Sequence, residues 1–208
     1  MTFHFSFPYN YLKLKIITEE CQIILAKIGI LLGSLRKESF SRKLAENVAT
    51  LFPGGYETEI VEIGNLPLYN QDYDDYNEVP AEYTAFRNKV KGLDAILFVT
   101  PEYNRSVPAV LKNALDVGSR PYGQSVWSGK PAAIISQSPG NLSAFGANHH
   151  LRQSLVFLNM PVVQQPEAYI GNVATLFDEN GKVTNESTVQ FLQSFVDAFV
   201  DLIKKYKG

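Results

Sequence analysis

Apolar positions along this chain switch between two spacings. Short continuous apolar runs at 28–32, 95–99 and 132–135 are typical of strands in a parallel sheet whose two faces are both covered. Looser apolar segments at 56–63 and 160–170 predict two further strands. Elsewhere apolar residues recur at three-and-four spacing, the period of an amphipathic helix. The predicted helices cover residues 44–52, 83–90, 108–115, 147–158 and 189–202.

This alternation of strands and helices predicts one α/β domain with a doubly wound, five-stranded parallel sheet and helices on both of its faces. In such a sheet a ligand lies beyond the carboxyl ends of the strands, where the strand order reverses. The loops that follow the strands are therefore the segments in which we expect the chemistry. The segment 64–80 has neither period, and its acidic run at 72–78 is predicted to be a solvated loop without calcium-ligand spacing.

Composition narrows the function classes. The chain has 208 residues, a formal net charge of -2 and 19% charged residues, which fits one globular domain and disfavours a nucleic-acid partner. Cys21 is the only cysteine, so an internal disulfide and a cysteine-based zinc site are both excluded. The apolar run 22–35 is broken by Lys27 and too short to span a bilayer. We expect a cytoplasmic protein with no membrane partner, in which residues 1–25 form an N-terminal extension and residues 26–208 the domain.

The loop after the first strand is rich in hydroxyl groups. Ser34, Arg36, Ser39 and Ser41 precede or open a predicted helix, and hydroxyls, a guanidinium and the free amides of a helix N-terminus together suit a phosphate monoester. The alternative is that Ser39 or Ser41 only caps the helix and that Arg36 lies on the surface. The residues of this loop alone do not separate the two interpretations.

Two common phosphate-binding motifs are absent from this loop. It has neither the three spaced glycines of a dinucleotide-binding Rossmann domain nor the Gly-Lys-Ser/Thr ending of a nucleoside triphosphatase. The flavodoxin-like sheet, with strand order 2-1-3-4-5, binds a mononucleotide through a hydroxyl-rich loop at the same place. The sequence therefore favours that variant of the fold.

Two more loops are predicted at the same sheet edge. Between Pro101 and Pro108 the chain is expected to form an ordered bend, whose backbone amides at 102–104 could bond the pyrimidine edge of a flavin beside the Tyr103 ring. The alternative is an ordinary strand-to-helix turn. The small polar loop 136–140 follows the fourth strand. It is a candidate for the site only because it is predicted to lie beside the loops after the first and third strands.

Four segments in the same order resemble the NAD(P)H-dependent FMN reductases, and among them the quinone, chromate and azo-dye reductases. The segments read Gly-Ser-Leu-Arg from Gly33 with Ser39, Leu-Pro-Leu-Tyr-Asn-Gln-Asp from Leu66, Pro-Glu-Tyr-Asn from Pro101 with Ser-Val-Pro from Ser106, and Leu-Lys-Asn-Ala from Leu111. The likeness covers residues 27 to about 170, and an ordered match of four segments is far more specific than any single loop.

The resemblance implies where FMN would bind. The stretch 34–41 would hold its phosphate, the stretch 101–104 would lie along the isoalloxazine, and the loop after the fourth strand would close the site. The implied cofactor-binding residues are Ser34, Arg36, Ser39, Phe40, Ser41, Pro101, Glu102, Tyr103, Asn104, Gln137 and Ser138. No catalytic side chain and no metal are implied, because flavin N5 carries the hydride.

The resemblance also implies a homodimer or homotetramer, in which Arg152 and Glu167 could pair across subunits or simply pack at the surface. The neighbouring His149 and His150 would point about a hundred degrees apart on a helix, which predicts a surface pair and no shared metal.

The predicted function is FMN-dependent transfer of two electrons from NADPH or NADH to a small acceptor, such as a quinone, azo dye, chromate or free flavin, by a ping-pong mechanism. The alternatives are a flavodoxin-type electron carrier and a flavin-binding regulatory protein with little turnover. Electron carriers tend to be strongly acidic for docking, and a net charge of -2 is weak for that role.

Overall fold

The computed structural model describes residues 25–207, so the predicted extension over residues 1–25 lies outside the described residues except for its last position. The described chain forms one parallel five-stranded sheet with the order β2-β1-β3-β4-β5, which confirms the predicted topology. Its strands are β1 (Ala26–Leu32), β2 (Tyr56–Ile60), β3 (Ala95–Thr100), β4 (Ala132–Gln137) and β5 (Ala168–Ile170).

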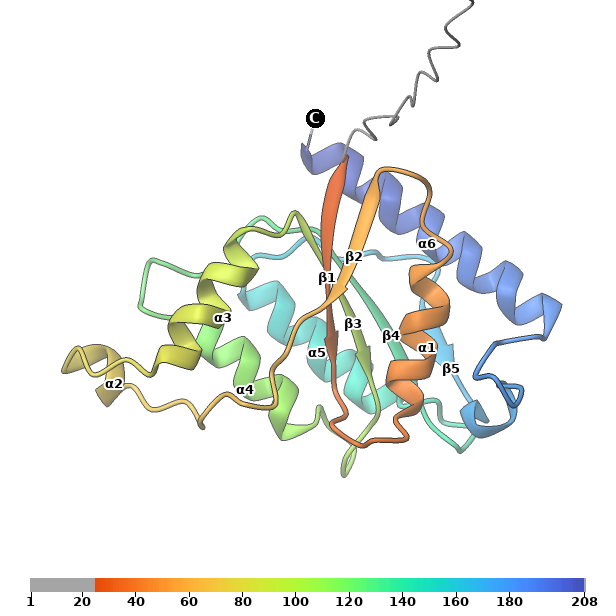
Figure 1. The fold of residues 1–208 in the computed structure, drawn as a ribbon, viewed down its shortest axis with the longest axis horizontal. Helices are drawn as coiled ribbons and strands as arrows, with labels where there is room; N and C mark the ends of the chain where they lie inside the picture. The colour runs from red at the N-terminus through yellow and green to blue at the C-terminus, as the bar shows by residue number, and fades with distance from the viewer. Residues whose placement is uncertain (1–24, 208) are drawn as a thin grey trace, which may run out of the picture.

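Helices cover both faces of the sheet (Figure 1). α1 (Phe40–Ala49) and α6 (Glu186–Lys207) pack on one face, and α3 (Ala81–Lys91), α4 (Ala109–Gly118) and α5 (Phe145–Phe157) pack on the other. Two short elements, α2 (Asp72–Asp75) and the 3-10 turn η1 (Val173–Thr175), complete the order. Within the described residues, no helix is both long enough and apolar enough to cross a membrane.

The core is divided by the sheet because successive strand residues point to opposite faces. Leu97 packs toward α1 and α6 with Phe195 of α6, whereas its neighbour Phe98 packs toward α3, α4 and α5 with Trp127. The Trp127 side chain is fully buried, and its indole N–H donates to the Leu115 carbonyl at 2.9 Å. Every residue of β3 and β4 is buried, as the continuous apolar runs predict.

The fifth strand is much shorter than the predicted segment 160–170. Apart from a single bridge between Ala132 and Val162, only Ala168–Ile170 pairs with β4. Pro166 has no N–H to donate to the ladder, and two exposed glutamines precede it. The second strand likewise ends at Ile60 instead of residue 63, although the Val61 amide still donates to Ile30 at 2.9 Å.

The acidic segment after β2 is less solvated than its composition predicts. It contains the one-turn helix α2, and the Asp74 carboxylate is buried against the Arg87 guanidinium, with both oxygens within 3.1 Å of it. Arg87 also donates to the Val117 carbonyl at 2.9 Å. Asn113 of α4 holds the earlier part of the segment, since it accepts from the Tyr69 amide at 2.8 Å and donates to the Pro67 carbonyl at 2.9 Å.

Candidate active site

The loops that follow β1 and β3 meet at the carboxyl edge of the sheet, at the bottom of Figure 1. The Gly33 amide donates to the Val99 carbonyl at 2.9 Å. A Cβ on Gly33 would clash with the Thr100 side chain and would lie 3.0 Å from Cδ of Pro101. Glycine is therefore required at position 33, because only its bare backbone lets the two loops approach and form one cradle.

The first loop ends in a capped helix. The Ser39 hydroxyl accepts from the Arg42 amide at 3.2 Å and so caps α1, as one of the two sequence interpretations requires. The same hydroxyl still has a proton to donate, and the first amides of the helix have no intrahelical acceptor. The first turn carries no acidic residue. The end of α1 thus suits an anion, and capping and phosphate binding are compatible roles for Ser39.

Ser41 and Gln137 are buried beneath this loop and contact each other. The Gln137 side-chain amide donates to the Ser41 hydroxyl at 3.0 Å, which ties α1 to the end of β4. Within residues 25–207, the Gln137 Oε1 atom is buried without a hydrogen-bond partner. Such a buried acceptor costs about 1–3 kcal/mol, and a ligand hydroxyl could satisfy it. The neighbouring Phe40 ring stacks on Phe177 at 6.2 Å, so at position 40 the backbone amide remains the group free for a ligand.

The bend after β3 is a two-residue hairpin. The Tyr103 amide donates to the Ser106 carbonyl at 3.0 Å, and the Ser106 amide returns the bond to Tyr103 at 3.0 Å. Between them Asn104 and Arg105 have φ values of 50° and 66°, the left-handed pair of a type I′ turn. An ordered bend was predicted here, but the Tyr103 amide is used inside the hairpin. The amides at 102 and 104 are the ones left for a ligand.

The Glu102 side chain, which was predicted to bind the cofactor, contacts other parts of the protein. Its carboxylate accepts from the Ala147 amide at 3.0 Å in the first turn of α5, and it pairs with Arg105 at 3.3 Å. A Cβ on Gly146 would lie 2.8 Å from the Arg105 carbonyl oxygen and 2.9 Å from the carboxylate. Glu102 therefore fixes the hairpin to α5, and a glycine at 146 makes this close approach possible.

The loop after β4 is held against β5. The Ser138 amide donates to the Ile170 carbonyl at 3.0 Å, and the Ser138 carbonyl accepts from the Val173 amide at 3.2 Å. The Ser138 hydroxyl donates within its own loop, to the Gly140 carbonyl at 2.8 Å. All three predicted loops are thus ordered at one sheet edge, and backbone bonds determine most of their shape.

Polar side chains of α5 face β5 and the hairpin. His149 bonds the Tyr169 hydroxyl at 3.0 Å, whereas His150 bonds the Ser106 hydroxyl at 3.0 Å, so the two exposed histidines serve different partners. Burial, followed by the nearby Glu167, raises the pKa of Tyr169 to about 12. Arg152 and Glu167 lie beside each other within one chain, with Nε and Oε1 3.8 Å apart.

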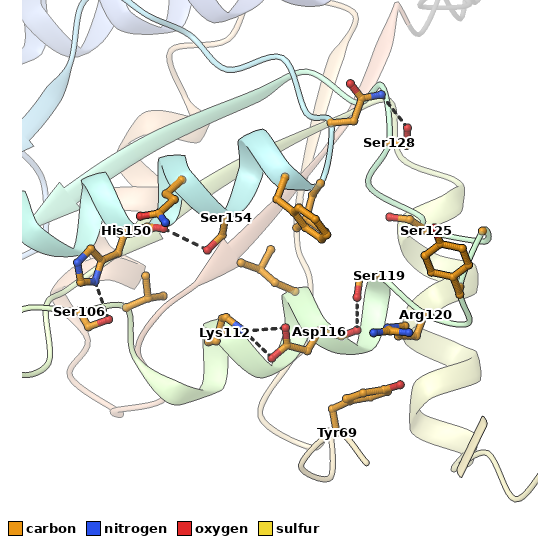
Figure 2. A pocket seen from close by; sticks show the side chains of 18 residues that line it. Tyr69, Ser106, Lys112, Asp116, Ser119, Arg120, Ser125, Ser128, His150 and Ser154 are labelled. Carbon is orange, nitrogen blue, oxygen red and sulfur yellow. Dashed lines mark hydrogen bonds and ion pairs between the residues drawn. The ribbon is translucent and has the colours of Figure 1, made fainter. Parts of the chain in front are cut away.

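A groove of about 900 Å³ lies between α4, α5 and the loop 119–128, and Ser106 and Val107 of the loop after β3 also line it (Figure 2). Lys112 and Asp116 pair across 2.7 Å on its α4 wall. Phe157 at the end of α5 lines it and is 89% exposed, and Tyr122 of the loop is 91% exposed. None of the eleven predicted cofactor-binding residues lines this groove, so the groove is not the predicted cofactor site.

Comparison with known proteins gives consistent matches. Residues 26–175 match the sequence profile of the NADPH-dependent FMN reductases. A quinone reductase of Pseudomonas putida is 57% identical over 178 residues, which cover 85% of this chain and 94% of that protein. A 2-hydroxy-1,4-benzoquinone reductase of Burkholderia is 45% identical, with coverage of 86% and 96%. The solved structure of a flavoenzyme NAD(P)H:(acceptor) oxidoreductase from Paracoccus denitrificans superposes with a TM-score of 0.82 at 42% identity, covering 88% of this chain and 99% of that one.

Proposed function

Because this chain belongs to the NADPH-dependent FMN reductase family, we propose that it takes two electrons from NADPH or NADH and passes them to a quinone by a ping-pong mechanism. The chain is an FMN-dependent oxidoreductase. When bound, FMN supplies the redox chemistry by accepting a hydride and releasing electrons to the acceptor. The observation that carries the proposal is the cradle at Gly33, where the capped end of α1 meets the loop after β3.

The end of α1 would hold the FMN phosphate. Ser34 and Ser39 bring hydroxyls to this end of the helix, Arg36 brings a guanidinium, and the free amides of the first turn add partial positive charge. Ser41 and Gln137 would act from below, since their mutual hydrogen bond fixes the start of α1 on β4. We therefore assign these two residues a supporting role and the outer three the direct contacts.

The hairpin after β3 would hold the isoalloxazine. The amides of Glu102 and Asn104 are fixed dipoles that could donate to the pyrimidine edge, where negative charge develops on reduction. The Tyr103 side chain, 52% exposed, lies at the same bend. Because Glu102 anchors this hairpin to α5, the amides would be held in place before the cofactor arrives. Pro101 and Ser138 would bound the site from the β3 and β4 loops.

The acceptor class is proposed from the relatives. Two of them are named quinone reductase and 2-hydroxy-1,4-benzoquinone reductase, and their similarity extends over nearly the whole described chain. A quinone is planar and could stack on the same face of the isoalloxazine ring that the nicotinamide uses. The reacting atoms would then be about 3–3.5 Å apart, which is a near-attack separation. Sequential use of one face is what makes a ping-pong mechanism the expected kinetic scheme. An azo dye, chromate or free flavin is a further candidate acceptor.

We also propose that the enzyme is a homodimer or homotetramer. The support is the exposed apolar surface on the face of α4 and α5, where Val156 and Phe157 are 75% and 89% exposed and Tyr122 lies across the groove at 91%. A second copy of the chain would remove these side chains from water. This surface adjoins Ser106, the last residue of the hairpin bridge.

The decisive experiment is the visible absorption spectrum of the purified protein, repeated without oxygen after adding NADPH and then a quinone. Flavin bands that bleach with NADPH and return with the quinone would support the proposal. Initial-rate plots should give parallel double-reciprocal lines, and intersecting lines would exclude the ping-pong scheme. A colourless protein that cannot be reconstituted with FMN would show that the three loops have another role.

A further inference from the structure

We propose that Arg105, at the tip of the hairpin after β3, selects quinone acceptors that carry a negative charge. Ionised hydroxyquinones are the class that its guanidinium would favour, because their charge lies on oxygen atoms that a guanidinium can bond. Arg105 is not among the predicted cofactor-binding residues. The inference rests on the proposed function, because it names the subclass of quinone that the same site prefers.

The backbone conformation at Arg105 is unfavourable for an arginine. Its φ of 66° follows a φ of 50° at Asn104, and the two residues form the centre of the type I′ turn. Asn-Gly is the preferred sequence for this turn, since glycine adopts a positive φ without steric cost, whereas a residue with a long side chain does not. Strain of this kind clusters at binding and active sites, so the function of position 105 is to be sought in its side chain.

The turn is fixed both within its own hairpin and against α5. The Tyr103 and Ser106 backbones exchange two hydrogen bonds of 3.0 Å at its base. The Arg105 carbonyl lies so close to α5 that a Cβ on Gly146 would be 2.8 Å from its oxygen. The Arg105 side chain therefore starts from a fixed position, on a loop that projects from the carboxyl edge of the sheet (Figure 1).

The guanidinium is largely open to a ligand. The Arg105 side chain is 72% exposed, and its bond to Glu102 Oε1 at 3.3 Å occupies one of its five N–H groups. The Glu102 carboxylate also accepts from the Ala147 amide at 3.0 Å, in the first turn of α5. That turn bears the positive end of the helix dipole. The carboxylate is therefore shared between two positive partners, and the tip of the hairpin keeps a net positive potential.

Arg105 directly follows the residues that would bind the flavin ring. The amides of Glu102 and Asn104 are assigned to the pyrimidine edge of the isoalloxazine, and Arg105 is the next residue of the hairpin. An acceptor stacked on the ring would therefore have one edge beside this guanidinium. A neutral quinone offers it a carbonyl oxygen, whereas an ionised hydroxyquinone offers an oxyanion, and charge-assisted hydrogen bonds are roughly twice as strong as neutral ones.

The test compares two naphthoquinones of similar size, the ionised 2-hydroxy-1,4-naphthoquinone and the uncharged 2-methyl-1,4-naphthoquinone. Without a reductant the FMN-loaded enzyme binds them without turnover, so calorimetry gives a Kd for each. Arg105→Gln should weaken binding of the hydroxy compound about three- to ten-fold, as expected for a charge-assisted contact at an exposed site, and should change binding of the methyl compound less than about two-fold. Arg105→Lys should retain most of the preference. Lys37→Ala removes an exposed charge from the neighbouring loop after β1 and should change neither Kd.

Arg105→Gly separates this role from a structural one. Glycine suits the turn, so the urea midpoint and the FMN content of this variant should be no lower than those of the parent, while the preference for the hydroxy compound disappears. A fall in stability with equal weakening of both quinones would overturn the assignment, because Arg105 would then only support the hairpin. An unchanged Kd for the hydroxy compound in Arg105→Gln would overturn it as well.

Turnover gives a second readout. At saturating NADPH, a rise in ionic strength should lower the kcat/KM of the parent for the hydroxy compound and leave that for the methyl compound nearly constant. Arg105→Gln should lose this salt dependence, and equal salt dependence in parent and variant would contradict the proposal. A parent enzyme that reduces neither quinone would refute the proposed function, whereas the Kd values of the oxidised enzyme would still decide the role of Arg105.

Discussion

The carboxylate of Glu102 accepts a hydrogen bond from the backbone amide of Ala147 at 3.0 Å, across 45 residues of sequence. It replaces the side-chain cap that α5 lacks, since the residue at its N-cap is Ala144. A negative charge at this position also complements the helix dipole. The same contact joins the hairpin after β3 to a helix, so it links fold stability to the shape of the proposed cofactor site.

Glu102→Ala should therefore lower both the stability of the fold and the affinity for FMN. The unpaired Ala147 amide should cost about 1–2 kcal/mol in the free energy of unfolding, and the loosened hairpin should raise the Kd for FMN several-fold. Urea unfolding of the apoprotein and fluorescence titration with FMN measure the two effects. Glu102→Gln keeps an acceptor and should recover most of the affinity, whereas equal losses in both variants would argue against this role.

Arg36→Ala should release FMN. If the guanidinium pairs with the phosphate, its loss should cost about 1.5–3 kcal/mol of binding free energy. The FMN absorbance that remains with the protein after gel filtration measures the effect. Lys37→Ala, one residue further along the same exposed loop, is the matched control. Full flavin occupancy in the Arg36 variant would count against a direct phosphate contact.

Phe157→Glu should shift the enzyme toward monomers. The side chain is 89% exposed in the single chain, so the change should leave the fold intact and place a charge in the proposed interface. Light scattering coupled to gel filtration reports the mass. Tyr206→Glu, on the exposed end of α6, should leave the assembly unchanged. An unaltered oligomer in the Phe157 variant would place the interface elsewhere.

Asp94 should make stability depend on acid pH. Burial alone would raise its pKa, but the Lys27 amide and the Lys207 ammonium outweigh burial and hold the pKa below the usual range. The stabilisation is thus present above the ordinary carboxyl pKa of about 4 and is lost as the pH falls through the lower folded value. Urea midpoints should show Asp94→Asn less stable than the parent at pH 7, with the gap closing in acid. Asp201→Asn, a surface residue paired with Lys204, should show a much smaller gap.

The architecture was predictable from sequence because parallel strands covered on both faces need unbroken apolar runs. The run at 95–99 became β3, and its alternate residues supply both halves of the core. The same rule predicted that the three candidate loops lie at one sheet edge, since each follows a strand. The local sequence was enough to predict that these loops exist. The need for glycine at position 33 could be seen only in the structure, because only there does the Thr100 side chain lie against it.

Long-range pairs were what sequence could not supply. In the sequence, Asp74 is one carboxylate of an acidic loop, and only the fold brings Arg87 to it. Glu102 read as part of a cofactor motif, yet its side chain is used by a helix that begins more than forty residues later. Asn113 carried a detectable signal, a polar residue between Leu111 and Ala114 on a buried helix face, but its partners in the 66–69 loop required the tertiary structure.

The carboxyl and amino ends of the strands lie beside different parts of the chain. The loops after the strands gather at one edge, and the end of α6 lies beside the start of β1 at the other, where Lys207 pairs with Asp94 at 2.9 Å (Figure 1). A linker joined to the end of α6 would therefore attach the enzyme to an electrode or resin with the edge of the proposed FMN site facing outward. Immobilisation through that helix should leave access of dissolved quinones unobstructed, which makes the orientation useful for an amperometric sensor.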